Sequence, residues 1–123
     1  MVAVINLDSV SGKAKAVSDA GRKTNVARYT APEGKRLADL MALVNEQYRI
    51  GLEEYSYWKE IPNDDDGSFI KAGFPCAIAC LGSFPYADPN YHLESDRPEA
   101  VDLENLRRAA QAALATVIRL DQE

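Results

Sequence analysis

The stretch from residue 73 to residue 102, GFPCAIACLGSFPYADPNYHLESDRPEAVD, indicates a buried strand, a long polar loop and the start of a helix. Its apolar run at residues 76–81 is typical of a strand covered on both faces of a sheet. The loop carries Tyr91 and His92, and His92 is the single histidine of the chain. Imidazole is the side chain best suited to hold a transition metal or to move a proton near neutral pH. Spacing alone leaves open that His92 is an ordinary loop residue.

A second buried strand opens the chain. Residues 2–7, VAVINL, are apolar and rich in β-branched side chains, and Asp8 follows them directly. In open α/β sheets ligands bind at the carboxyl ends of strands, so Asp8 stands where a functional group is expected. The alternative is that Asp8 only caps the turn at residues 8–12.

Periodicity predicts the elements between these strands. Alternation around Asp19-Ala20-Gly21-Arg22 predicts a half-exposed hairpin over residues 13–30, whose lysines suit a sheet edge. A capping-box spacing at Thr30 and Glu33 then introduces an amphipathic helix with an apolar stripe. The members of that stripe are Leu37, Leu40, Met41, Val44 and Tyr48. Residues 52–59 are expected to form a strand that packs aromatic side chains.

Two further helices complete the predicted architecture. A short one is expected at residues 67–72, and a long one begins at Asp102 as its N-cap. The long helix is expected to cover the sheet with Leu103, Leu106, Ala110, Ala113, Val117 and Leu120. The sequence therefore predicts an α/β fold, a mixed sheet flanked by helices in a three-layer arrangement.

Composition limits the class of protein. A chain of 123 residues with 46% hydrophobic content fits one compact domain, residues 1–123. A net charge of −5, without lysine and arginine clustered among aromatics, argues against nucleic-acid and anionic-membrane partners. No apolar run approaches the roughly 20 residues of a membrane span, and no signal-type start is seen, so a cytoplasmic location is the default expectation.

Three groups of reactive side chains do not indicate a functional site. Cys76 and Cys80 lie four apart in a predicted strand, about 13 Å between Cα atoms, which is too far for a disulfide. We interpret Glu53 and Glu54 as surface carboxylates. The acidic run at residues 64–66 fails as a calcium loop, because its first and last ligand positions hold Pro62 and Gly73.

The chemistry-bearing stretches resemble the C-terminal half of the zinc-dependent aminopeptidases with co-catalytic metals, whose relatives include glutamate carboxypeptidases and glutaminyl cyclases. Asn6-Leu7-Asp8 is similar to a strand end of that family. Residues 64–69, DDDGSF, resemble its Ser-Asp-His-any-any-Phe segment, with Asp66 in place of the histidine. Residues 73–75, GFP, and Tyr91-His92 follow in the same order as in the family. The residues after Asp8 depart from the family pattern, since Ser9-Val10-Ser11-Gly12 stands where Met-(Ile/Val)-Gly is common.

This resemblance implies roles for five residues. Asp8 and His92 would each supply one zinc ligand, and the Tyr91 phenol would donate to the developing oxyanion. Asp65 would lie at the rim of the site, and Asp96 would support the histidine loop. The resemblance covers only the C-terminal half of a family domain, whose other ligands and general base precede the matching strand. Catalytic zinc normally has three protein ligands, so two imply a weak, incomplete site.

The implied function is a partial zinc aminopeptidase-like domain that is inactive as an isolated chain. Its substrate would be a peptide once a complementing N-terminal half is present. Two alternatives stay open: a non-catalytic, self-assembling scaffold module, and a single-metal acyltransferase of the glutaminyl-cyclase kind. Truncation should leave residues 2–7 or 76–81 with an unpaired edge or an uncovered face, so a homo-oligomer burying well over about 1,000 Å² is also expected.

Overall fold

One four-stranded sheet organises the molecule. The computed structural model describes residues 2–62 and 64–123. The strands follow the order β1-β4-β2-β3, and β4 pairs parallel with β1 but antiparallel with β2, while β2 and β3 are parallel. Their bounds are Val4–Ser9 for β1, Thr24–Tyr29 for β2, Glu53–Trp58 for β3 and Ala77–Leu81 for β4. The sheet is therefore mixed, and β1 is one of its edges.

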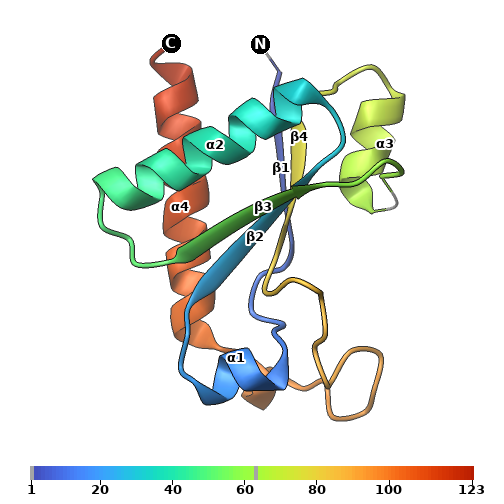
Figure 1. Ribbon diagram of the computed structural model, residues 1–123, viewed down its shortest axis with the longest axis vertical. Helices are drawn as coiled ribbons and strands as arrows, with labels where there is room; N and C mark the ends of the chain where they lie inside the picture. The colour runs from blue at the N-terminus through green and yellow to red at the C-terminus, as the bar shows by residue number, and fades with distance from the viewer. Residues whose placement is uncertain (1, 63) are drawn as a thin grey trace.

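Helices cover both faces of this sheet (Figure 1). Their bounds are Lys15–Asp19 for α1, Pro32–Gln47 for α2, Asp65–Lys71 for α3 and Leu103–Asp121 for α4, with a 3-10 turn, η1, at Pro98–Ala100. α2 and α4 pack together on one face, and α3 lies on the other against β1 and β4. The predicted three-layer α/β arrangement is confirmed. No helix in the described ranges is long and apolar enough to cross a membrane.

The core lies between the sheet and the pair α2 and α4. Ile78 and Cys80 of the fully buried β4 project into it, where they meet Met41 of α2 and Ala112 of α4. A side chain at Gly34 would lie 2.6 Å from the Ala77 carbonyl oxygen, so α2 approaches β4 closely because residue 34 has no Cβ. The predicted strand at residues 76–81 is thus an interior strand and not an edge.

The hairpin predicted for residues 13–30 is wrong. This segment forms α1 and then β2, an interior strand buried along most of its length. Two polar residues of β2 misled the pattern because they are buried with polar partners: Asn25 Nδ2 donates to Glu54 Oε2 at 3.1 Å, and Arg28 Nη2 to Asp66 Oδ1 at 3.0 Å. The parallel pairing of β2 with β3 also requires the long α2 crossover.

α4 turns a different face inward from the one expected. Its N-cap is Asp102 as predicted, and Oδ1 accepts from the Asn105 backbone at 3.0 Å. The side chains that α4 buries are small or polar, namely Asn105, Ala109, Ala112 and Thr116. Of the predicted face, Ala113 and Leu120 pack partly against the core, whereas Leu103, Leu106, Ala110 and Val117 are exposed.

The physical reason for this rotation of α4 lies in Asn105. Its side chain accepts from the Thr24 backbone N–H at 2.7 Å and donates to the Thr24 carbonyl at 3.0 Å. The buried amide therefore completes the backbone hydrogen bonds at the start of β2, and the alanines one and two turns later allow a close helix-to-sheet approach. Hydrophobicity alone misplaces the buried stripe when a polar side chain is satisfied in this way.

The start and end of α2 also differ from expectation. The helix begins after Ala31, and no side chain caps it, so the capping box at Thr30 and Glu33 is absent. Tyr48, predicted on the apolar stripe, is the C-cap residue and is exposed.

Candidate functional site

The carboxyl ends of β1 and β4 meet at one end of the molecule, the lower end in Figure 1. The pairing register of these strands is irregular between Leu7 and Ser9, and Asp8 is the extra residue at that irregularity. Bulges of this kind re-aim a side chain, and the Asp8 carboxylate is exposed. The long loop that carries His92 leaves β4 beside it, so the two predicted site segments start side by side.

Two glycines let the loops after β1 and β4 interlock. A side chain at Gly82 would collide with the Gly12 carbonyl oxygen. A side chain at Gly12 would lie 2.8 Å from both Tyr86 Oη and Asp88 Oδ2. The phenol and the carboxylate therefore reach the turn after Asp8 because residue 12 has no Cβ.

Tyr86 connects Asp8 with the histidine loop. Partial burial raises the pKa of the Tyr86 phenol, and the nearby Asp88, Tyr91 and Asp8 raise it further, while a hydrogen bond with Ser9 opposes them. The phenol therefore stays protonated at neutral pH and can donate a hydrogen bond. Sequence analysis missed Tyr86, because only the folded loop brings it back to β1.

The tyrosine and histidine of the predicted motif continue this chain of contacts. The Tyr86 and Tyr91 rings meet edge to face with centroids 5.5 Å apart, and the Tyr91 and His92 rings are 3.9 Å apart. His92 has a left-handed backbone with φ of +58°, an uncommon conformation for a residue with a side chain. Contacts thus run from Asp8 through Ser9, Tyr86 and Tyr91 to His92.

The two acidic residues assigned supporting roles are exposed. Asp96 lies in a turn, where its backbone N–H donates to the Leu93 carbonyl at 3.0 Å. Asp65 lies in the first turn of α3. Their roles at the rim and behind the loop stay predictions, as do the ligand roles of Asp8 and His92.

The buried carboxylate of the acidic run is Asp66, which sequence reasoning set aside. It is fully buried and pairs with Arg28, which also contacts Asp64 at 2.7 Å. Arg28 belongs to β2, where it pairs with Ala79 of the neighbouring β4. Asp66, which stands where the family pattern has a histidine, therefore forms an ion pair with β2.

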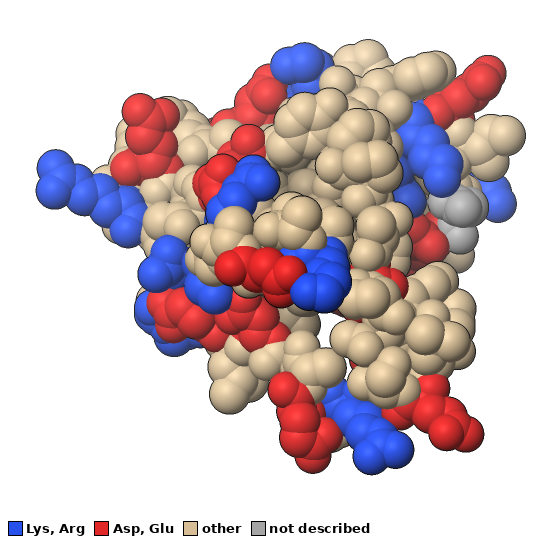
Figure 2. Space-filling view, turned by 60° about the horizontal axis from the view of Figure 1, so that its bottom comes forward, with Lys and Arg blue, Asp and Glu red and all other residues tan. Residues whose placement is uncertain are grey.

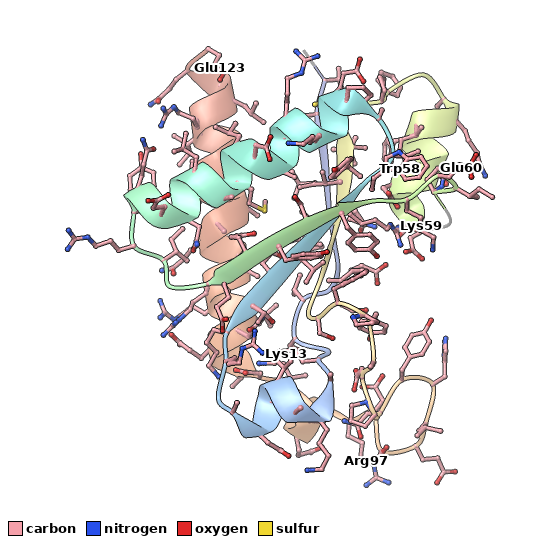
Figure 3. The ribbon with its side chains drawn as sticks, in the orientation of Figure 1. Lys13, Trp58, Lys59, Glu60, Arg97 and Glu123 are labelled. Atoms are coloured by element: carbon pink, nitrogen blue, oxygen red, sulfur yellow. The ribbon has the colours of Figure 1, made fainter. Side chains whose placement is uncertain are left out.

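Lys13 links the turn after β1 to the start of α4. Its ammonium group is almost fully buried and binds Asp102 Oδ2 at 2.6 Å and the Arg22 carbonyl at 2.9 Å. Burial by itself raises the pKa of Asp102, but hydrogen bonds from Lys13, Lys23 and the Asn105 backbone hold it well below its usual range. Lys13 and the Arg97 region of the loop lie at the same end of the molecule (Figure 3).

Glu54 is half-buried and accepts a hydrogen bond from Asn25, so it is not the free surface carboxylate that was expected, whereas Glu53 is exposed. Burial raises the pKa of Glu54 to about 7, and the hydrogen bond from Asn25 opposes that shift. Burial and the nearby Glu54 raise the pKa of the Cys80 thiol to about 12. Asn25 and Cys80 both contact Met41 of α2, so they lie on the opposite side of the sheet from Asp66.

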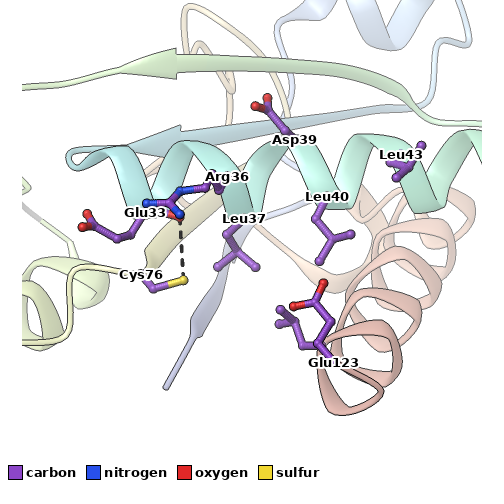
Figure 4. A pocket seen from close by; sticks show the side chains of 9 residues that line it. Glu33, Arg36, Leu37, Asp39, Leu40, Leu43, Cys76 and Glu123 are labelled. Carbon is purple, nitrogen blue, oxygen red and sulfur yellow. Dashed lines mark hydrogen bonds between the residues drawn. The ribbon is translucent and has the colours of Figure 1, made fainter. Parts of the chain in front are cut away.

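An apolar hollow of about 480 Å³ lies away from this site, between α2, the end of α4 and the start of β4 (Figure 4). Leu37, Leu40 and Leu120 line it, and the Cys76 thiol contacts the Glu33 carbonyl at 3.7 Å. Burial raises the pKa of that thiol, so it is a poor nucleophile. The hollow holds no arrangement for catalysis.

The residues present do not make a complete zinc site. Over residues 2–62 and 64–123, no three His, Cys, Asp or Glu side chains are grouped so as to hold a metal ion. Catalytic zinc normally uses three protein ligands. Asp8 and His92 are therefore at most a part of such a site.

Lysine and arginine side chains are interspersed with acidic ones over the face that brings this end of the molecule forward (Figure 2). A surface of mixed sign does not attract phosphate backbones. That face offers no support for a nucleic-acid partner.

Comparison with known proteins gives one match. A family model described as Peptidase family M28 matches residues 1–117, which is nearly the whole chain. The same chain matches no curated protein and no solved structure.

Proposed function

From the premise that the chain belongs to peptidase family M28, we propose that it is the part of a zinc aminopeptidase-like domain that contributes Asp8 and His92. Each residue supplies one ligand to a metal site whose other ligands come from a complementing N-terminal half. The substrate is a peptide, and the isolated chain is inactive.

The observation that supports this proposal most strongly is the contact path at the carboxyl ends of β1 and β4. Asp8 sits on the irregularity of β1, and Tyr86 and Tyr91 bridge the space to His92. These residues come from the two segments that resemble the metal-binding parts of the family. The ring contacts hold the histidine loop next to the strand end.

In this proposal Tyr91 acts on the substrate, and its exposure supports that role. Its ring rests on Tyr86 and His92, yet 54% of the residue is exposed, so the phenol is accessible. A phenol donates a hydrogen bond to the oxygen of a peptide carbonyl as negative charge develops there. The chain thus carries an oxyanion donor, while the general base belongs to the complementing half.

The free edge of β1 is where that half would join. An edge strand presents unpaired backbone N–H and C=O groups along one side, and such a side recruits another strand. Pairing there would place new side chains next to Asp8.

Isothermal titration calorimetry with zinc tests the proposal. We expect the chain to bind zinc with a dissociation constant weaker than about 1 µM, and Asp8→Asn and His92→Ala each to abolish that binding. Asp19→Asn, an exposed carboxylate on α1, is the matched control and should leave the affinity unchanged. Tight stoichiometric zinc would contradict the proposal. So would turnover of an aminoacyl chromogenic substrate that His92→Ala abolishes.

A further inference from the structure

The outward face of α4 is an apolar ridge. Leu103, Leu114 and Ile118 are exposed by 73%, 62% and 49%, although they belong to a helix whose opposite face is in the core. From Leu103 to Ile118 the ridge runs for about 22 Å at the usual rise of a helix. Arg107 interrupts this face between Leu103 and Leu114, but large apolar side chains exposed on one face of a helix are typical of a place where another protein binds.

Grooves flank this ridge on both sides. One, of about 360 Å³, separates α4 from the end of α2 and is lined in part by Tyr48, Ile50 and Gln111. The other, of about 510 Å³, separates α4 from β1 and is lined in part by Ala3 and Val117. A ridge between two grooves is the shape that a second helix of the same kind can fit.

The sequence of α4 is complementary to itself in the reverse direction. Arg107 and Asp121 lie seven positions before and after Leu114, and Ala110 and Ile118 lie four positions before and after it. An antiparallel pair of α4 helices centred on Leu114 would therefore set arginine against aspartate and a small side chain against a large one. Both contacts would occur twice because of the twofold symmetry.

The charges at the two ends are available for such a contact. Arg107 is exposed, and within residues 2–62 and 64–123 its ion pair lies in its own helix, with Glu104 at 2.5 Å. An exposed pair of this kind contributes little, so Arg107 can engage a second carboxylate at small cost. Asp121 is exposed near the other end of α4 and forms no ion pair among the described residues.

We infer that α4 is a self-association surface on which two copies of the chain pack antiparallel, with Leu114 at the twofold axis. A helix pair in contact over this length, with its flanking grooves filled, buries on the order of 1,000 Å², which is the lower range of specific interfaces. The inference is independent of the proposed function, because it uses outward-facing residues of α4 and none of the residues proposed for the metal site. The start of α4 does contact the turn after β1, through Asp102 and Lys13.

Sedimentation velocity or light scattering at about 50 µM chain tests the first part. We expect a dimer, and Leu114→Glu should weaken it at least about tenfold, since two carboxylates then face each other at the axis. The matched control is Ile61→Glu, at a residue exposed by 68% in the loop after β3. A monomeric wild-type chain would overturn the inference, as would a dimer that Leu114→Glu leaves intact.

Charge reversal tests the register. Arg107→Glu and Asp121→Arg should each weaken the dimer about fivefold, and the double variant should recover the wild-type affinity to within about threefold. Circular dichroism of each variant verifies that α4 is still helical. Equal weakening in the double variant would overturn the Leu114-centred register. A negative result for the dimer does not change the expected zinc titration, so each proposal can be contradicted without the other.

Discussion

Arg28 and Asp66 form the most deeply buried ion pair among the described residues. Asp66→Ala should lower the free energy of unfolding by about 3 kcal/mol, because removing one partner of a buried pair leaves the other charge poorly compensated. Asp64 retains its contact with Arg28, which limits the loss. Urea unfolding measures the effect, with the exposed neighbour Asp65→Ala as control. A loss equal to that of the control would show that the pair contributes no net stability.

Glu54 makes stability depend on pH in an unusual direction. Its pKa in the folded chain is about 7, above the ordinary value of 4.5, so the folded state binds the proton more tightly than the unfolded state does. The contribution of Glu54 is therefore fully present below pH 4.5 and is lost as pH rises to 7. Between those limits we expect a loss on the order of 2 to 3 kcal/mol.

Glu54→Gln isolates this effect, because the amide retains the size of the side chain and does not ionise. The difference between the stabilities of wild type and variant, measured by urea unfolding from pH 4.5 to pH 8, should move in favour of the variant as pH rises. A difference that is flat across this window would contradict a raised pKa at Glu54.

At the level of single residues, sequence motifs pointed to the candidate site residues but not to the residues that contact them in the fold. Asp8, Tyr91 and His92 stand in short local patterns, so they could be singled out. Tyr86 and Arg28 could not, because the role of Tyr86 arises from a loop that folds back onto β1, and that of Arg28 from the Asp66 side chain, which reaches β2 from α3. The predicted functions of the motif residues still await a test.

Among the elements, α2 depends on a single glycine. Gly34→Ala adds a methyl group 2.6 Å from the Ala77 carbonyl oxygen. Although alanine favours a helix by about 1 kcal/mol over glycine, we expect this variant to lose about 1 to 3 kcal/mol of stability as α2 is pushed from β4. The neighbouring exposed Lys35→Ala, within the same turn, should change stability by less than about 0.5 kcal/mol. Thermal unfolding that shows Gly34→Ala to be stabilised would contradict the tight packing.

β1, β3 and β4 were predictable as strands, and β2 was not. The apolar run of β4 is fully buried, whereas β1, predicted to be buried, is a half-buried edge strand with Leu7 exposed. The segment leading into β2 alternates polar and apolar residues and therefore imitates an exposed hairpin. The same cause misplaced the buried face of α4, where Asn105 completes backbone hydrogen bonds at β2.

At the scale of the whole molecule, two surfaces outside the core are open to contact. β1 is a sheet edge with Asp8 at its carboxyl end, and α4 presents an apolar ridge on the outside. The resemblance to one half of a family domain predicted the open edge. The ridge was not predicted: hydrophobic periodicity had assigned Leu103 to the core and had given Leu114 and Ile118 no role.

The central claim is that Asp8 and His92 share one metal ion. Zinc-edge anomalous diffraction from crystals soaked in a zinc salt tests it most directly. We predict a single peak at this end of the sheet, about 2.0 to 2.2 Å from an Asp8 carboxylate oxygen and about 2.0 to 2.1 Å from a His92 ring nitrogen. Functional groups of Asp8 and His92 more than about 10 Å apart, with zinc at neither, would contradict the account.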